Sequence, residues 1–268
     1  MLRFMKYEIR GTYRYITGVL ILSLILFTAI YHYVNRGSTG SLGGNLFVTL
    51  CILLLFGTAL VTFLYIVGSF RKELYEDTGY LTFTLPLTGY QITASKLLVA
   101  LLWFFVLGVA VTAINLVLIF AYLPLEISFG ELLRQIAEML SFKHIFVFLL
   151  DAVLSGVGLL ALIYFSMALS RVTFRNRKIG GLWFAVFLIL AVILGYGRYR
   201  IADLLPYSLD LGNLNDGAMT TGYATNNFIF MIKASTVKIN IAGFVFSLLT
   251  AAALFLGTGY LVEMKTDL

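Results

Sequence analysis

The sequence predicts an all-α membrane protein with six transmembrane helices in a single domain over residues 1–268. Of the 268 residues, 60% are hydrophobic and only 12% are charged, and the mean hydropathy is +0.96. The apolar residues gather in six runs, most of which reach the roughly 20 residues that a helix needs to cross a bilayer core. A soluble domain does not require so much apolar surface, so the composition indicates a polytopic membrane protein.

The first expected element is an amphipathic basic helix over residues 1–14. Its apolar residues fall at helical spacing, and its basic residues take the other faces. The apolar residues are Leu2, Met5, Ile9 and Tyr13, and the basic residues are Arg3, Lys6, Arg10 and Arg14. We expect this helix to lie in the membrane interface before the chain turns inward. The alternative is a solvated basic tail.

Six membrane spans follow, with boundaries set by hydropathy. They are Tyr15–Val34, Leu46–Ser69, Leu97–Leu123, Ile145–Leu169, Gly180–Tyr196 and Ile239–Val262. Between the third and fourth spans, Glu126–Lys143 is expected to form an amphipathic outer helix, because Ser128 and Glu131 have capping-box spacing. Between the fifth and sixth spans, residues 198–238 are expected to form an extracellular helical segment, broken at Pro206 and followed by polar turn-forming residues.

The distribution of basic residues predicts the orientation. With the N-terminus inside, the inner side carries twelve of the nineteen Lys and Arg residues, and the segment Arg171–Lys178 is the strongest single anchor. This bias places both termini in the cytoplasm. The formal net charge of +6 favours anionic lipid headgroups over nucleic acid as its counterpart.

Two polar residues inside the spans are candidates for an intramembrane site. Asp151 lies in the fourth span, where a carboxylate is costly and therefore a functional candidate by default. The alternative is a shallow residue that is hydrated or paired with a cation such as Lys143. Asn115, in the third span, is better suited to a hydrogen bond between helices than to binding a substrate. The sequence has no phosphate-binding loop and no metalloprotease or nucleophile-turn motif.

The segment Phe70–Lys96 joins the second and third spans, and we expect a helix, a break, a short apolar turn and a second helix. Gly79 and Pro86 interrupt the first helix, and Thr88 with Gln91 has the spacing of a capping box that begins the second. A solvated loop would be polar, whereas this turn retains apolar side chains that suit it to contact another protein. These side chains are Tyr80, Leu81, Phe83, Leu85 and Leu87.

The same segment carries an ordered motif, in which an acidic-Gly stretch precedes Leu-Thr-x-x-Leu-Pro, and an Ile and a Ser-Lys pair lead into the third span. Its residues are Asp77, Gly79, Leu81, Thr82, Leu85, Pro86, Ile92, Ser95 and Lys96. With six spans and a basic N-terminal helix, this motif makes the chain resemble the permease subunits of bacterial ABC-2 type transporters. It departs from the pattern at Tyr80, where an acidic or small residue is more usual.

The resemblance implies a permease subunit of the bacterial cytoplasmic membrane that docks a separate cytosolic ATPase and exports a peptide, antibiotic or lipid-like amphiphile. The implied coupling residues are Asp77, Gly79, Tyr80, Leu81, Phe83, Leu85, Pro86 and Leu87. ATP and magnesium would bind to the partner, so this chain is expected to hold no catalytic, cofactor or metal site. The expected partners are the ATPase, a second permease chain (identical or different) and the lipid bilayer, without nucleic acid.

Two other functions stay open at the level of the sequence. A membrane sensor that docks an ATPase without transporting cargo would share the same docking segment, and cargo flux in reconstituted vesicles separates it from a permease. An intramembrane enzyme would need a nucleophile, a base or metal ligands converging at one depth, and Asp151 alone does not supply them.

Overall fold

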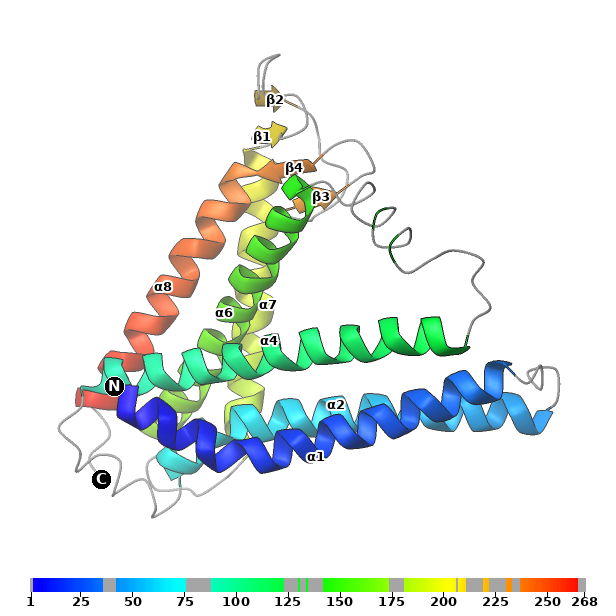
Figure 1. The fold of residues 1–268 in the computed structure, drawn as a ribbon. Helices are drawn as coiled ribbons and strands as arrows, with labels where there is room; N and C mark the ends of the chain where they lie inside the picture. Colours follow the sequence, from blue (N-terminus) through cyan, green and yellow to red (C-terminus); the bar gives the residue numbers. More distant parts are fainter. Residues whose placement is uncertain are drawn as a thin grey trace. The chain divides into compact units, whose positions relative to one another are not determined.

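The computed structural model describes residues 2–35, 42–75, 88–122, 130, 134, 142–173, 181–205, 207–210, 219–221, 230–232 and 237–264. Most of these residues are helical (Figure 1). The long helices are α1 (Leu2–Asn35), α2 (Leu42–Tyr75), α4 (Gly89–Tyr122), α6 (Phe142–Thr173), α7 (Leu182–Leu204) and α8 (Ile241–Met264). Among the described residues, these six helices are long and apolar enough to cross a membrane, which indicates a multi-pass membrane protein.

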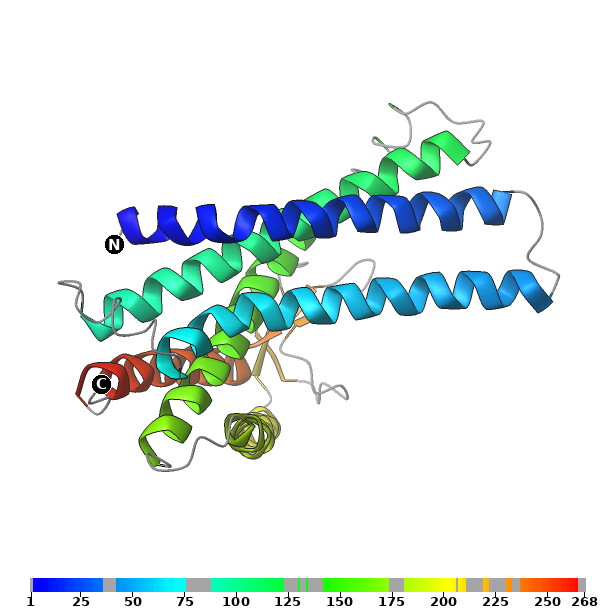
Figure 2. The same ribbon diagram turned by 90° about the horizontal axis from the view of Figure 1, so that it is seen from below.

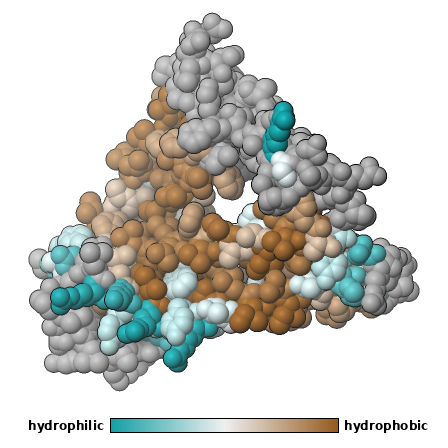
Figure 3. All heavy atoms as spheres, in the orientation of Figure 1, coloured by the Kyte–Doolittle hydropathy of each residue, from teal (hydrophilic) through white to brown (hydrophobic). Residues whose placement is uncertain are grey.

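The apolar surface of these helices is largely exposed. In the most apolar stretch of each helix, at most 28% of the residues are buried, and in α7 none is. Figure 3 shows hydrophobic residues covering the helices in brown, with hydrophilic residues in teal gathered toward helix ends. So much exposed apolar surface is not compatible with water but matches a lipid environment.

The chain divides into two compact units. The first consists of Met1–Phe70 and Leu98–Leu133, and so contains α1, most of α2 and most of α4. The second consists of Arg71–Leu97 and Arg134–Leu268, and so contains α6, α7 and α8. The C-terminal end of α2 and the N-terminal end of α4 therefore belong to the second unit, although the rest of each helix belongs to the first.

In the first unit, aromatic side chains join α1 to α2, which run side by side (Figures 1 and 2). Tyr15 stacks on Tyr65 with 4.0 Å between ring centroids. Near the other end of these two helices, the ring centroids of Tyr33 and Phe47 lie 5.0 Å apart. Stacked and tilted ring pairs of this kind bury a large apolar area and hold a defined geometry.

Two further contacts join α4 to its neighbours in the first unit. The indole Nε1 of Trp103 donates a hydrogen bond of 2.8 Å to the Thr12 hydroxyl of α1. The ring of Phe104 lies 5.9 Å from that of Phe63 in α2. The contacts of this unit are therefore made by large side chains that reach from one helix to the next.

The N-terminal basic segment differs from the sequence-based expectation. It does form a helix, but α1 is continuous over 34 residues, with no turn between residues 1–14 and the first apolar span. The sequence allows this because it has no proline there, and the Thr12 hydroxyl donates to the Glu8 carbonyl one turn earlier. The expectation of a separate element that precedes the membrane span is corrected accordingly.

In the second unit, α6 contacts both α7 and α8, and α7 also contacts α8. Glycines allow some of this packing to be close. A Cβ atom added to Gly257 of α8 would lie 2.8 Å from the ring of Phe165 in α6, so a larger residue would displace either that ring or the helices. Small residues of this type are how helices approach one another in membranes.

A four-stranded antiparallel sheet adjoins α6 and α8. Its strands are β1 (Tyr207–Asp210), β2 (Met219–Thr221), β3 (Phe230–Ile232) and β4 (Val237–Asn240), in the order β2-β1-β4-β3. The register places Leu209 opposite Ile239, and Ile239 opposite Phe230. The expectation of an all-α chain with a helical segment between the fifth and sixth spans is therefore wrong for these residues.

The alternation of two strands and the end of α7 have local causes in the sequence. The sequence YSLD of β1 and the sequence VKIN of β4 alternate apolar and polar residues, which is the period of a strand. Pro206 disfavours helical backbone at the residue before it, and Leu205 indeed leaves the helix with φ −124° and ψ 75°. α7 thus ends where Pro206 requires it to end, and β1 follows.

Asn240 fixes the junction between the sheet and α8. Its Oδ1 accepts a 2.8 Å hydrogen bond from the backbone N–H of Gly243, which caps the first turn of α8. Its Nδ2 donates to the Ala202 carbonyl of α7 at 3.4 Å. The end of α7 and the start of α8 are therefore held together at the sheet.

Candidate functional site

The candidate coupling residues fall outside the described residues, but the helix ends on both sides of them are described. The residues outside are Asp77, Gly79, Tyr80, Leu81, Phe83, Leu85, Pro86 and Leu87. Before them, α2 ends at Tyr75, and after them, α4 begins at Gly89. We call these two flanks the coupling base, defined as residues 71–75 and 88–97.

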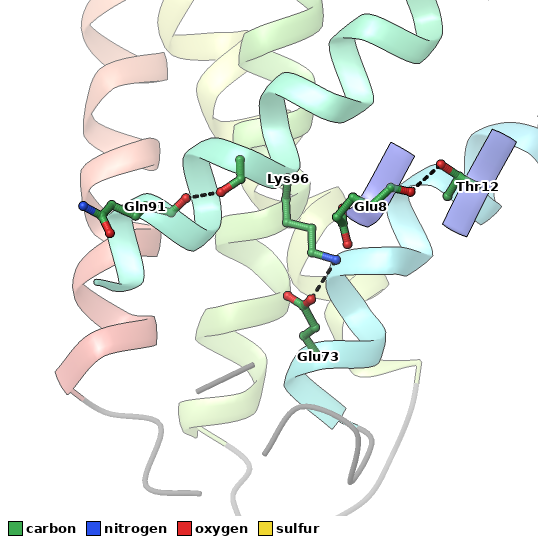
Figure 4. A network of polar contacts seen from close by, with 6 residues as sticks. Glu8, Thr12, Glu73, Gln91 and Lys96 are labelled. Atoms are coloured by element: carbon green, nitrogen blue, oxygen red, sulfur yellow. Dashed lines mark hydrogen bonds and ion pairs between the residues drawn. The ribbon is translucent and has the colours of Figure 1, made fainter. Parts of the chain in front are cut away.

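The start of α4 has the capping box that the sequence predicts. The backbone N–H of Gln91 donates to the Thr88 hydroxyl at 3.3 Å, and the N–H of Thr88 donates to the Gln91 side-chain oxygen at 3.4 Å. The Ser95 hydroxyl also donates to the Gln91 carbonyl (Figure 4). These bonds satisfy groups at the first turn of a helix that would otherwise lack partners.

A buried ion pair joins the two halves of the coupling base. The Nζ of Lys96 in α4 lies 2.8 Å from the Oε1 of Glu73 in α2, as Figure 4 shows. The side chains are only 2% and 13% exposed. Removing one partner of a buried pair leaves an uncompensated charge, which costs about 3–5 kcal/mol. The helices on either side of the coupling residues are therefore fixed to each other.

The α2 half of the base is also attached to α6. The Tyr75 hydroxyl donates a 3.1 Å hydrogen bond to the Met167 carbonyl. The guanidinium of Arg171 lies 5.7 Å from the centre of the Tyr75 ring, within the range of a cation–π interaction. Arg171 begins the basic segment that the sequence indicates as the strongest cytoplasmic anchor.

The α4 half of the base is attached to α8. A Cβ added to Gly89 would lie 2.6 Å from the Gly259 carbonyl and 2.9 Å from the Glu263 backbone nitrogen. A Cβ added to Gly259 would overlap the Tyr90 ring. These glycines permit an approach of backbone to backbone that any side chain would prevent.

Taken together, the contacts of the base link four helices at one end of the second unit. This end is opposite the sheet, since Met167 and Gly259 lie near the C-terminal ends of α6 and α8, while the sheet adjoins their N-terminal ends. A force applied to the segment between α2 and α4 would therefore reach α6 through Tyr75 and α8 through Gly89 and Tyr90.

Sequence reasoning missed Glu73 and Tyr75 as parts of this arrangement, and it treated Lys96 only as a motif position and an inner charge. A signal was available, because Glu73 and Lys96 carry opposite charges close to the two helix ends that flank one short segment. Ion pairing between such ends is a natural way to neutralise charges near a membrane boundary.

The two intramembrane candidates lie in different units. In the first unit, Asn115 accepts a hydrogen bond from the Tyr31 hydroxyl of α1 at 3.5 Å and donates to the Val111 carbonyl at 2.9 Å. In the second unit, the Asp151 carboxylate accepts a 3.3 Å hydrogen bond from the Ser155 hydroxyl and lies near enough to Arg198 of α7 to interact electrostatically. Asn115 and Asp151 therefore belong to separate units, and each has hydrogen-bond partners within its own unit.

The sequence did not indicate the electrostatic interaction between Asp151 and Arg198. The side chain of Lys143, the cation considered there, lies outside the described side chains. Within the described ranges, no three His, Cys, Asp or Glu side chains gather as a metal site requires.

No protein-family model, no curated protein and no solved structure matches the chain.

Proposed function

We propose that the chain is the membrane-spanning permease subunit of an ATP-binding cassette transporter. A separate cytosolic ATPase would bind the segment between α2 and α4 and supply the energy from ATP. A second permease chain would complete the transport pathway, and the cargo would be an amphipathic molecule such as a peptide, an antibiotic or a lipid-like compound.

The observation that carries this proposal is the coupling base. A docking segment transmits force only if its flanks are firmly attached to the helices that must move. The flanks of this segment are attached to each other by the Glu73–Lys96 ion pair, to α6 by Tyr75 and to α8 by Gly89. The segment between them retains apolar side chains in the sequence, which suits it to a protein contact.

In mechanistic terms, the ATPase would bias a two-state membrane assembly. Closure of two ATPase subunits on ATP would displace the two docking segments, and the base would pass that displacement to α6 and α8 of each permease as a rigid-body movement. The chain itself would contribute no chemistry to ATP hydrolysis, since the nucleotide would be held by the partner.

Substitutions in the docking segment test this proposal. The chain is co-expressed and co-purified with a cytosolic ABC ATPase, and ATP hydrolysis is measured in lipid. The double substitution Leu85→Asp with Pro86→Gly should reduce hydrolysis to the rate of the isolated ATPase, because it removes an apolar contact and a backbone constraint. The chain should remain membrane-inserted and monodisperse.

A matched control is Leu205→Asp, which places the same charge at an exposed position next to the sheet, at the other end of the second unit. It should leave the ATPase rate unchanged. Equal rates for the docking variant and the wild type would sink the coupling role. Loop-dependent hydrolysis without cargo flux in reconstituted vesicles would instead identify a sensor that docks the same type of ATPase.

A further inference from the structure

A cavity of about 250 Å³ lies between α6, α7 and α8 in the second unit. Its walls are mainly apolar, and Arg198 of α7 is the charged residue among those that line it. A neighbouring hollow of about 380 Å³ shares Leu154 and Ala251 with this cavity, but only apolar residues line it. The first cavity therefore combines an apolar interior with a group that can recognise a charged ligand.

The cavity exists because all three helices contribute small residues to its walls. These are Ser155 and Gly158 of α6, Ala191 and Gly195 of α7, and Ser247 and Ala251 of α8. A Cβ added to Gly158 or Gly195 would meet nothing within 4 Å. Unlike Gly257 and Gly259, these two glycines do not serve close helix packing, and the effect of their missing side chains is to leave space.

Arg198 lies in the wall of the cavity, and a carboxylate of opposite charge, that of Asp151, lies next to this wall. Arg198 is half-buried, and the Asp151 carboxylate interacts with it electrostatically. Asp151 also accepts the hydrogen bond of Ser155, a residue of the cavity wall. The guanidinium has the planar donor geometry that suits a phosphate. Charged residues within membrane spans are costly and commonly mark binding sites.

We propose that this cavity binds an aminophospholipid, that is, a lipid whose headgroup carries a phosphate and a primary ammonium. The phosphate pairs with Arg198, the ammonium lies near Asp151, and one acyl chain fills the apolar part of the cavity. This proposal requires only that the chain be embedded in a bilayer, and it is independent of the ATPase.

The charge pattern selects among headgroups. The negative charge of Asp151 disfavours a headgroup that carries only negative charge, because that carboxylate would oppose it. A choline headgroup has a positive charge but no N–H donor for the Asp151 carboxylate. An ethanolamine headgroup provides both the phosphate for Arg198 and the N–H donors for Asp151.

The test uses the full chain in nanodiscs that contain equal parts of phosphatidylethanolamine, phosphatidylglycerol and phosphatidylcholine. Native mass spectrometry then identifies the lipids that stay bound to the released protein. The wild type should retain phosphatidylethanolamine in preference to the other two. Arg198→Gln should weaken retention by about tenfold, as expected for the loss of a charge-assisted hydrogen bond. Asp151→Asn should abolish the preference for ethanolamine over glycerol.

Filling the cavity tests the apolar part of the site. Gly195→Leu places a side chain into the open space and should remove the bound lipid while leaving the helices packed. Three matched controls should behave as the wild type. Arg200→Gln, the control for Arg198→Gln, changes an exposed arginine of the same helix. Asp203→Asn, the control for Asp151→Asn, changes an exposed aspartate. Gly108→Leu, the control for Gly195→Leu, changes a glycine of α4 whose Cβ position is also open.

Several results would overturn the proposal. One is equal retention of the three lipids by the wild type. Another is unchanged lipid retention by the Arg198→Gln or the Gly195→Leu protein when that protein is monodisperse.

A competition experiment compares lyso-phosphatidylethanolamine with free phosphoethanolamine at the same concentration. Displacement by the lyso-lipid alone is the expected result, and equal displacement by the free headgroup would exclude a role for the apolar walls.

Discussion

Each of the two compact units of the chain is stabilised internally by a different kind of contact. In the first unit, large side chains reach across, as Tyr15 does to Tyr65 and Trp103 does to Thr12. In the second unit, glycines allow close contact, with the backbone of α8 at Gly89 and with aromatic rings at Gly257 and Gly259, and a buried ion pair fixes the coupling base. Within a bilayer, the hydrophobic effect does not drive helices together, so these specific contacts determine the packing.

This difference has a consequence for how each unit responds to substitution. A contact between two large side chains can adjust, because each has rotamers that preserve part of the contact. A contact of backbone with backbone, as at Gly89, has no such freedom, since any added atom overlaps its neighbour. We therefore expect the second unit to be the less tolerant of change, although it contains the cavity.

The largest expected effect is at the coupling base of the second unit. Lys96→Met should destabilise the folded protein by about 3–5 kcal/mol, because it removes the ammonium that lies 2.8 Å from the buried Glu73 carboxylate. The loss of stability is measured by unfolding the protein in detergent while its helix content is monitored by far-UV circular dichroism. The charge-swapped protein, with Glu73→Lys and Lys96→Glu, should recover most of it, and recovery no better than either single substitution would show that the pair is not what fixes the base.

An intermediate effect is expected at the glycine contacts. Gly259→Ala should destabilise the protein by about 1–3 kcal/mol, since the new methyl group overlaps the Tyr90 ring and must displace either that ring or the helix that carries it. The matched substitution Gly108→Ala in α4 meets nothing within 4 Å and should be neutral or stabilising by up to about 1 kcal/mol. The same unfolding measurement compares them, and equal effects of the two substitutions would contradict the difference between the units.

The smallest effect is expected in the first unit. Trp103→Phe keeps an aromatic ring but removes the N–H that donates to Thr12, and should cost about 1 kcal/mol or less. The Thr12 hydroxyl keeps its own bond to the Glu8 carbonyl, so no polar group loses its only partner. A loss as large as that of Gly259→Ala would show that the first unit depends on single polar contacts after all.

Hydropathy predicted all six membrane helices, but the ends of the helices needed other signals. The apolar runs locate the lipid-embedded part of each helix, whereas α2 continues past the charged residues Arg71 and Lys72 to Tyr75. The start of α4 was predictable because Thr88 and Gln91 form a local capping pattern. The sheet was not, because its strands have three or four residues, and β1 pairs with β4 across a long stretch of chain.

The candidate site was predictable in its location but not in its contacts. The order of charged, glycine and proline residues marks the segment between α2 and α4 as unusual, but only the fold shows that Tyr75 reaches Met167 or that Gly89 lies against Gly259. The electrostatic interaction of Asp151 with Arg198 likewise joins residues of two helices. Such contacts depend on helix rotation and depth, which periodicity in one helix does not determine.

The continuity of α1 has a mechanical consequence. A helix of 34 residues is about 51 Å long, whereas the bilayer core is about 30 Å thick. Its exposed basic residues are Arg3, Lys6, Arg10 and Arg14. They therefore lie at the end of one rigid helix that includes the membrane span, and not on a separate helix that can move independently at the membrane surface. A change of about 10° in the tilt of α1 about its midpoint would move that charged end by roughly 4 Å, so thickness of the bilayer and position of the charge are linked through one rigid element.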